Sequence, residues 1–303
     1  MKQPISRGSL ATPQARAHTY RQETDSGRRA FGLTLKGGIN ALLLLYVFTA
    51  IFPPIWMIYS SLKTSAEFAR STFALPGSLY LENYARIFQK GVIYRAYFNS
   101  LFASTISIIL IVLFSFLAAY FLARYRFPGR NLIYLLFMFG VLVPIYALLV
   151  PVFLTFSRIG MLNNQFTIIP PMVAFALSSS IFLIESYIHS IPVELEEAAF
   201  IDGSGLPTSL RLIIFPMCMP IVATVIILNC LATWNEFAFP LVLLRNPQLK
   251  TIPLWLNTFK GEYSTDYTGQ MAALVMASLP VILLYLVFHR KIIHGMTSGA
   301  VKG

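Results

Sequence analysis

The stretch Ala96–Ala123 reads AYFNSLFASTISIILIVLFSFLAAYFLA and contains no Asp, Glu, Lys or Arg. A helix needs about 20 predominantly apolar residues to cross the hydrocarbon core of a bilayer, and this stretch is longer. Five more charge-free windows exceed the same length: Gly37–Leu62, Asn131–Ser157, Ile159–Ile184, Leu212–Asn235 and Tyr267–His289. The sequence therefore predicts an all-α membrane protein with six transmembrane helices.

The composition of the whole chain agrees with a membrane protein. Of its 303 residues, 56% are hydrophobic and 12% are charged, and the mean hydropathy is +0.68. Soluble domains carry about 25% charged residues, so this composition excludes a typical soluble enzyme, a nucleic-acid-binding domain and a disordered protein. The net charge of +11 comes from basic residues at the ends of apolar runs, where the cytoplasmic leaflet attracts them. The expected environment is membrane lipid, with no nucleic acid partner.

The distribution of basic residues indicates the orientation. An even number of spans places both termini on one side, and with the N-terminus inside, most of the 23 Lys and Arg residues are cytoplasmic. The prediction is N-in and C-in, in the cytoplasmic (inner) membrane of a prokaryote. Residues 1–36 are polar and basic, which is typical of a disordered cytoplasmic tail. A six-span domain over 37–290 and a cytoplasmic C-terminal tail over 291–303 follow.

Prolines recur within or beside the predicted spans. They are Pro53–Pro54, Pro144, Pro151, Pro170–Pro171, Pro216, Pro220 and Pro280. Each proline frees a carbonyl that a neighbouring helix or cavity water must satisfy in lipid. Any single proline is compatible with a kinked helix packed in a bundle, but together they favour a transporter with broken helices.

The loop between the fourth and fifth windows carries a distinctive pattern. Ile191–Gly205 reads IPVELEEAAFIDGSG, with four acids and no Lys or Arg. Pro192 and the acids favour a helix start, and Gly203 permits a left-handed stop, so we expect a short helix over Val193–Ile201. Leu195, Ala198 and Ala199 would share one face and fit a groove on a partner. The alternative is a solvated helix that only connects two spans.

This loop resembles the EAA loop of ABC importer permeases. The residues that carry the resemblance are Glu197, Ala198, Ala199, Gly203, Ile213, Phe215 and Pro216. Only Phe215 departs, standing where that family usually has Leu. Trp234–Phe237 and Gly299–Gly303 point to the carbohydrate-uptake, MalG-like branch. Ser61–Thr64 and Asn99–Ser100 support this assignment, whereas Glu185 departs from it.

The resemblance implies a site and partners. The loop over 191–210 would be a coupling helix that docks into a cytoplasmic ATPase subunit, and the chain's end would also reach the ATPase dimer. The coupling residues would be Glu194, Glu197, Ala198, Ala199, Asp202, Gly203, Ile213 and Pro216, and the end residues Gly299, Ala300, Val301, Lys302 and Gly303. A MalF-like second permease and an extracytoplasmic solute-binding protein would complete the assembly.

The chain itself lacks a nucleotide-binding motif. It contains no Gly-x-x-x-x-Gly-Lys-Ser/Thr loop, so we expect a non-catalytic subunit with ATP and Mg²⁺ bound on the partner ATPases. The four histidines are far apart, and Cys218 and Cys230 lie in one apolar window, so no metal site and no disulfide framework is predicted. No catalytic set of Ser, His and Asp or of paired carboxylates is visible.

Polar residues near the spans are candidates for a translocation path. They are Asn229, Asn235, Glu236 and Tyr146. Hydrogen bonding between helices is the alternative for Asn229, Tyr146 and also Asn99. Glu236 has two other options, a pair with Arg245 or contact with the binding protein. Glu185 and His189 fit packing at the inner membrane surface better than a proton relay.

The predicted function is ATP-driven import of a sugar, with an oligosaccharide expected. Glycerol-phosphate or another polyol-like solute is an alternative within the same class. An ion-coupled secondary transporter would need a charged site near a span centre, and the window centres carry no charge. A membrane-embedded enzyme would need paired catalytic residues at one depth.

Overall fold

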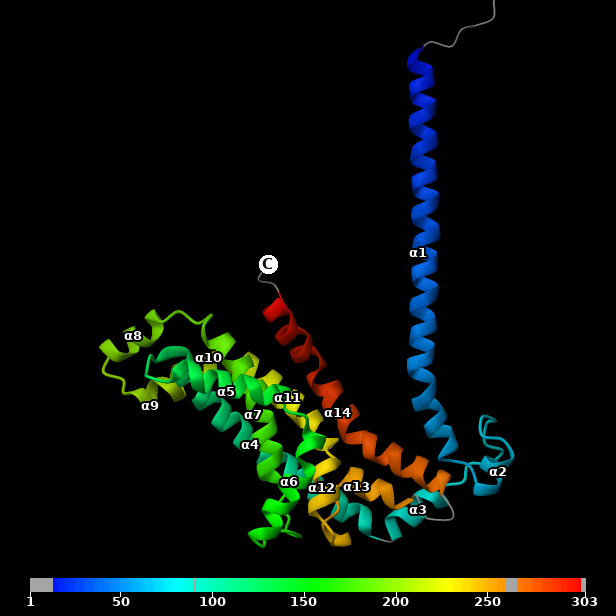
Figure 1. Cartoon of the computed structure of the whole chain (residues 1–303). Helices are drawn as coiled ribbons and strands as arrows, with labels where there is room; N and C mark the ends of the chain where they lie inside the picture. Colours follow the sequence, from blue (N-terminus) through cyan, green and yellow to red (C-terminus); the bar gives the residue numbers. More distant parts are fainter. Residues whose placement is uncertain (1–12, 90, 260–265, 301–303) are drawn as a thin grey trace, which may run out of the picture. The chain divides into compact units, whose positions relative to one another are not determined.

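The computed structural model describes residues 13–89, 91–259 and 266–300, and every regular element within these ranges is a helix (Figure 1). The chain divides into two compact units, residues 1–57 and residues 58–303. These helices, several of them apolar and of membrane-spanning length, confirm the coarser prediction of an all-α membrane protein.

The first unit consists of α1 (Pro13–Ser60), whose last residues continue into the second unit. Its stretch Lys36–Ser60 is long and apolar enough to cross a membrane. Residues 13–36, which the sequence predicts as part of a disordered tail, are helical in the structure. Once the apolar part has nucleated a helix, each added residue gains one hydrogen bond, and Ala, Arg, Gln and Glu favour the extension. Residues 1–12 lie outside the described residues.

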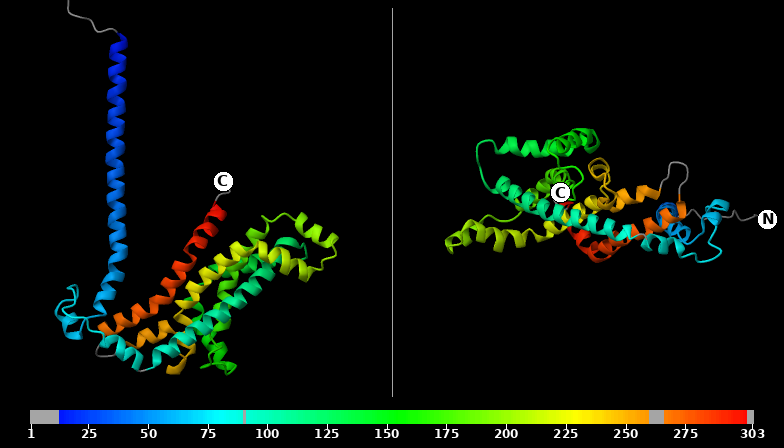
Figure 2. Two further views of the ribbon diagram at one scale, coloured as in Figure 1. Left: turned by 180° about the vertical axis from the view of Figure 1, so that it is seen from behind. Right: turned by 90° about the horizontal axis from the view of Figure 1, so that it is seen from below.

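The second unit is built around α4 (Val92–Arg124), α7 (Ile169–Ile188) and α11 (Met219–Trp234), which pack against one another. The view from behind shows α4 running alongside α11 (Figure 2). Their core holds Ile111, Tyr120, Ile184, Ile214 and Val225. Buried small residues of α4 allow close helix approach, as is typical of membrane bundles: Ala103, Ser104, Ser107 and Ala119.

The third predicted window, Asn131–Ser157, is a broken helix. It forms α5 (Arg130–Leu142) and α6 (Ile145–Arg158), which meet at an angle of 104°. Val143 at the break is extended, with φ −76° and ψ 116°, because a residue before proline is forced out of the helical region. Pro144 therefore ends one helix and starts the next.

The fourth and fifth windows also differ from straight helices. The helical part of the fourth window begins only at Ile169, because Gly160 and Asn163 adopt positive φ in the preceding turn. The fifth window begins inside a π-helical turn, η1 (Leu210–Ile214), which follows α9 (Leu206–Ser209), and it continues through α10 (Phe215–Met217). A bend of 73° then separates these elements from α11.

Short helices occupy the loops, and a long one ends the chain. The short ones are α2 (Ser65–Arg70), α3 (Glu82–Gln89), α8 (Glu194–Ile201), α12 (Ala238–Leu243), η2 (Pro247–Leu249), α13 (Ile252–Leu256) and η3 (Asn257–Phe259). The long one is α14 (Tyr267–Ala300). A second apolar cluster joins α3, α4, α11, α13 and α14 through Ile87, Ile93, Trp234, Trp255 and Ala273.

The described residues give three straight candidate spans and two bent pairs, or up to five spans if each pair crosses once. The apolar stretch Tyr267–Leu283 of α14 is shorter than these. A membrane-embedded helical protein is thus established, while six spans and the N-in/C-in orientation stay predictions.

Candidate functional site

The short helix expected after the fourth window is present as α8, between α7 and α9. Its first turn holds Glu194, Glu196 and Glu197, which a helix N-terminus favours because of its partial positive charge. It ends at Asp202, and Gly203 follows with φ +82°, a left-handed conformation that glycine adopts without a steric penalty.

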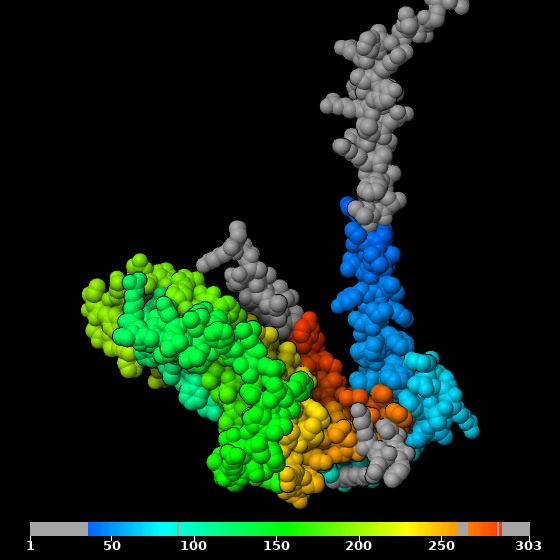
Figure 3. All heavy atoms as spheres, viewed as in Figure 1, coloured from blue at the N-terminus to red at the C-terminus, as the bar shows by residue number. Residues whose placement is uncertain are grey.

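One side of α8 and its flanking residues, here called the outward face, is exposed in the part of the chain that the structure describes. Val193, Leu195, Phe200 and Ile201 expose 46%, 43%, 47% and 86% of their surface. Glu194, Glu197, Ala198, Asp202 and Gly203 are exposed as well. In the space-filling view this segment lies on the surface of the second unit (Figure 3). Contiguous apolar side chains among acids indicate a protein contact surface.

The opposite side of α8 packs into the chain and carries Glu196 and Ala199, which are buried. Ala199 was expected to face the partner together with Leu195 and Ala198, and the structure corrects this placement. Ala199 follows Leu195 by four residues and Glu196 by three, so helical spacing allows it to share a face with either. Its burial together with Glu196, while Leu195 and Ala198 are exposed, places it on the inner side. Ala199 therefore acts by letting α8 lie close to its own chain.

Glu196 is the functional residue that the sequence-based prediction missed. Its Oε1 accepts a hydrogen bond from Arg124 Nε at 2.6 Å, and its Oε2 accepts one from the Tyr120 hydroxyl at 2.7 Å. The guanidinium of Arg124 also donates to the Ile191 carbonyl at 2.8 Å. The side chains of Arg124 and Glu196 are only 9% and 6% exposed, so each charge is neutralised by its partner. Their separation of 72 residues leaves no local signal for the pair.

A second acid–base cluster lies beside this pair. Glu185 Oε1 is 2.9 Å from His189 Nε2 and 3.9 Å from Arg130. Arg130 Nε also donates to the Leu122 carbonyl at 2.6 Å. Glu185 and His189 thus serve packing, as the sequence favoured. A cavity of about 710 Å³ lies beside this contact between the end of α4 and α8, and Arg126 and Glu194 are among its lining residues.

The remaining predicted coupling residues belong to other elements. Ile213 is half-buried in η1 against the core, and Pro216 is exposed in α10. The predicted ATPase contact at the chain's end falls partly on Val301, Lys302 and Gly303, which lie outside the described residues. Gly299 and Ala300 form the last two residues of α14.

Two of the predicted path residues, Asn229 and Asn235, form hydrogen bonds within the chain. Asn229 is buried and donates to Ser180 Oγ at 3.1 Å and to the Val225 carbonyl at 2.8 Å, so it bonds α11 to α7. Asn235 is exposed and donates to the Leu231 carbonyl. Tyr146 is 79% exposed at the start of α6. The structure therefore uses Asn229 for helix packing, the alternative that the sequence left open.

Glu236 has a third role that was not anticipated. Its Oε1 accepts a hydrogen bond from the backbone N–H of Phe239 at 3.0 Å, which caps the start of α12. The guanidinium of Arg245 lies 5.6 Å from the centre of the Phe153 ring instead of pairing with Glu236.

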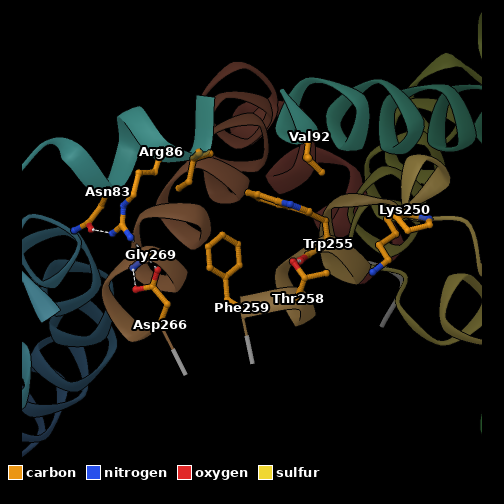
Figure 4. Close-up of a pocket in the computed structure, with 11 residues that line it drawn as sticks. Asn83, Arg86, Val92, Lys250, Trp255, Thr258, Phe259, Asp266 and Gly269 are labelled. Atoms are coloured by element: carbon orange, nitrogen blue, oxygen red, sulfur yellow. Dashed lines mark hydrogen bonds and ion pairs between the residues drawn. The ribbon is translucent and has the colours of Figure 1, made fainter. Parts of the chain in front are cut away.

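A second cavity, of about 470 Å³, lies between α3 and α13 (Figure 4). Phe259 points into it beside Trp255, and the two rings meet edge to face at 5.2 Å. Arg86 and Asp266 pair at 3.6 Å on one side, and Lys250 lies on the other. Aromatic rings beside charged groups suit a polar ligand or a protein side chain. Among the described side chains, no group of three His, Cys, Asp or Glu residues is placed to hold a metal ion.

Residues 111–297 match the family of the binding-protein-dependent transport system inner membrane component. The chain belongs to this family. The matched range runs from the middle of α4 into α14 and includes α8 with its buried ion pair. The identification as an ABC importer permease of the carbohydrate-uptake branch is thereby confirmed.

Curated relatives match nearly the whole chain. The diacetylchitobiose uptake system permease protein NgcG of Streptomyces coelicolor is 34% identical over 265 residues, covering 87% of this chain and 88% of that protein. The multiple sugar-binding transport system permease protein MsmG of Streptococcus mutans is 35% identical over 271 residues, covering 88% and 94%.

A solved structure shares the fold. A chain of a bacterial ABC transporter involved in the import of the acidic polysaccharide alginate superposes with a TM-score of 0.74 at 24% identity. The match covers 87% of this chain and 97% of that one.

Proposed function

We propose that this permease subunit carries a sugar, expected to be an oligosaccharide, across the cytoplasmic membrane and is driven by ATP hydrolysis on separate ATPase subunits. The observation that carries the proposal is α8, whose acidic and apolar outward face is held in place by a buried ion pair on the other side. The printed functions of NgcG and MsmG support a sugar as the solute.

The proposed topology has six spans with both termini inside. Three straight helices, two bent pairs and α14 supply the six crossings. This arrangement places the short basic segment Arg124–Arg130 and the helix α8 on the cytoplasmic side, where the positive-inside rule favours arginines. The cavity between α3 and α13 then faces outward, toward the solute-binding protein.

The proposed role of α8 is to dock in a groove of the ATPase. Leu195, Phe200 and Ile201 supply apolar contacts, and Glu197 and Asp202 pair with basic groups at the rim of that groove. ATP and Mg²⁺ are bound by the ATPase dimer, and its closure moves α8. A MalF-like permease completes the solute path, and the chain's end at Gly299–Gly303 adds a second contact with the ATPases.

The test combines composition and transport. The tagged chain is purified from its host in mild detergent, identified with its partners by mass spectrometry, and reconstituted in vesicles with labelled oligosaccharides. We expect a stoichiometric ATPase, a second permease and uptake that requires ATP, with ADP as the control. A chain that purifies alone and transports without ATP would overturn the proposal.

A further inference from the structure

We infer that α4 is a rigid rod that carries the movement of α8 to the opposite side of the membrane, and that the Arg124–Glu196 pair is its attachment point. The inference rests on the proposed function. It adds the path by which the movement of α8 is transmitted, and it assigns Arg124 and Glu196 as positioning residues. Neither Arg124 nor Glu196 lies on the outward face of α8.

The attachment at the C-terminal end of α4 is strong because it is buried and consists of several hydrogen bonds. Two hydrogen bonds, at 2.6 and 2.7 Å, bring Arg124 and Tyr120 of α4 to the carboxylate of Glu196. The Arg124 guanidinium also holds the Ile191 carbonyl, just before α8. Separating the pair would leave two poorly solvated charges, which is strongly unfavourable. A displacement of α8 therefore displaces the end of α4.

The chain connection from α8 toward α11 is softer than this contact. Toward α11, the backbone passes through Gly203 at φ +82°, the π-helical turn η1 and a bend of 73°. Glycines and π-turns are points where a chain absorbs movement. Movement of α8 thus reaches the core more directly through Glu196 than along the backbone toward α11.

The helix α4 is suited to transmit this force. It runs from Val92 to Arg124 without a proline, whereas both bent pairs contain one at or near their break. At a rise of 1.5 Å per residue, Asn99 and Arg124 lie about 37 Å apart along the axis. That distance exceeds the thickness of the hydrocarbon core, about 30 Å.

The N-terminal end of α4 is fastened to the loop that lines the α3–α13 cavity. Asn99 Nδ2 donates to the carbonyls of Gln248 and Lys250 at 2.9 and 3.1 Å. Ser100 Oγ accepts a hydrogen bond from the backbone N–H of Ile252 at 2.8 Å. Lys250 lines the cavity and α13 begins at Ile252, so a shift of α4 moves this wall.

The test uses the complete importer in vesicles and the variant Glu196→Gln. This change keeps the side-chain shape and an acceptor for Tyr120 but removes the charge that neutralises Arg124. The matched control is Glu185→Gln, an acid 7% exposed against 4% for Glu196, which contacts Arg130 and His189 but not α8. The measured quantity is solute transported per ATP hydrolysed.

We expect Glu196→Gln to assemble, to hydrolyse ATP and to transport about tenfold less solute per ATP, whereas Glu185→Gln keeps the wild-type ratio. A fluorescent probe at Lys250→Cys, with Cys218 and Cys230 replaced by Ala, reports the outer end. Its ATP-dependent signal should vanish in Glu196→Gln and persist in Glu185→Gln, a pattern that a purely structural role would not produce.

An unchanged ratio in Glu196→Gln, or an equal loss in Glu185→Gln, would overturn the inference. Should Glu196→Gln fail to assemble, Tyr120→Phe decides, because it removes one hydrogen bond and leaves the ion pair. We expect the ratio to fall by about fivefold in Tyr120→Phe, and a wild-type ratio would refute the attachment. If the wild-type importer shows no ATP-driven uptake, the proposed function itself fails, which the other outcomes leave intact.

Discussion

Gly203 shows how one residue sets the placement of α8, the proposed coupling helix. Its φ of +82° turns the chain directly after α8, and a methyl group at this position would meet no neighbouring atom. The constraint is therefore conformational and not steric. Gly205, two residues later, has an ordinary φ of −76°, and a methyl group there would lie 3.9 Å from the Pro207 ring. The two glycines form a matched pair for substitution.

We predict that Gly203→Ala costs about 1 kcal/mol of local stability and lowers ATP-driven uptake, and that Gly203→Pro abolishes uptake while the protein still inserts. Proline cannot adopt the positive φ, so α8 would no longer seat in the ATPase groove. Uptake assays on membranes with matched expression measure both effects. Gly205→Ala is the control and should transport normally, and equal loss in both alanine variants would contradict the argument.

Charge reversal on the outward face gives a second prediction at this scale. Glu197→Lys should abolish uptake and uncouple the ATPase without preventing insertion, because the lysine would face the basic groups that we assign to the groove rim. Uptake and ATP hydrolysis, measured on the same vesicles, separate these effects. Wild-type transport by Glu197→Lys would remove α8 as the coupling element.

Lys63 shows a different constraint, burial of a cation. Its Nζ donates to the carbonyls of Ser71 and Thr72 at 3.1 Å and lies over the Tyr59 ring, while Glu67 is nearby. Burial lowers the pKa of Lys63 below its ordinary 10.5, and the charge of Glu67 opposes this shift. A lowered folded-state pKa means that the folded chain binds fewer protons than the unfolded chain at high pH.

The free energy of unfolding should therefore rise as the pH increases from the lowered pKa of Lys63 toward 10.5. This increase should be absent in Lys63→Met. Thermal unfolding of the purified protein at a series of pH values measures it, with the difference between wild type and Lys63→Met isolating the single group. If the thermal unfolding midpoints of the wild type and of Lys63→Met change with pH in parallel over this range, the pKa of Lys63 is not lowered in the folded protein.

At the scale of elements, the sequence predicts what local patterns encode. The charge-free windows locate every long helix, because apolar composition acts within one segment. Pro144 marks one break, and Pro216 and Pro220 flank the other. The span prolines Pro53, Pro54, Pro151 and Pro280 lie inside continuous helices, so a proline alone does not predict a break. The angle of 104° at Val143–Pro144 and the late start of α7 depend on how segments pack. The pairing of Glu196 with Arg124 and the inward placement of Ala199 likewise join distant parts of the chain, so no local pattern contains them.

The bond between α7 and α11 is an element-scale contact that can be measured directly. We expect a double-mutant cycle on Asn229→Ala and Ser180→Ala to give a coupling of about 0.6 kcal/mol, the usual size for hydrogen bonds between membrane helices. Unfolding in detergent measures it. Additive single effects would show that the bond does not join the two helices.

For the whole molecule, residues near the two ends of α4 allow a test of the orientation of the chain in the membrane. Thr208 is exposed in α9 beside the coupling helix, and Thr258 is exposed at the α3–α13 cavity. With Cys218 and Cys230 replaced by Ala, we expect a membrane-impermeant thiol reagent to label Thr258→Cys in intact cells and Thr208→Cys only after permeabilisation. The cytoplasmic placement follows from the arginines beside α8, which the positive-inside rule retains inside. Labelling of Thr208→Cys from outside would reverse the orientation, and α8 would then be unable to meet a cytoplasmic ATPase.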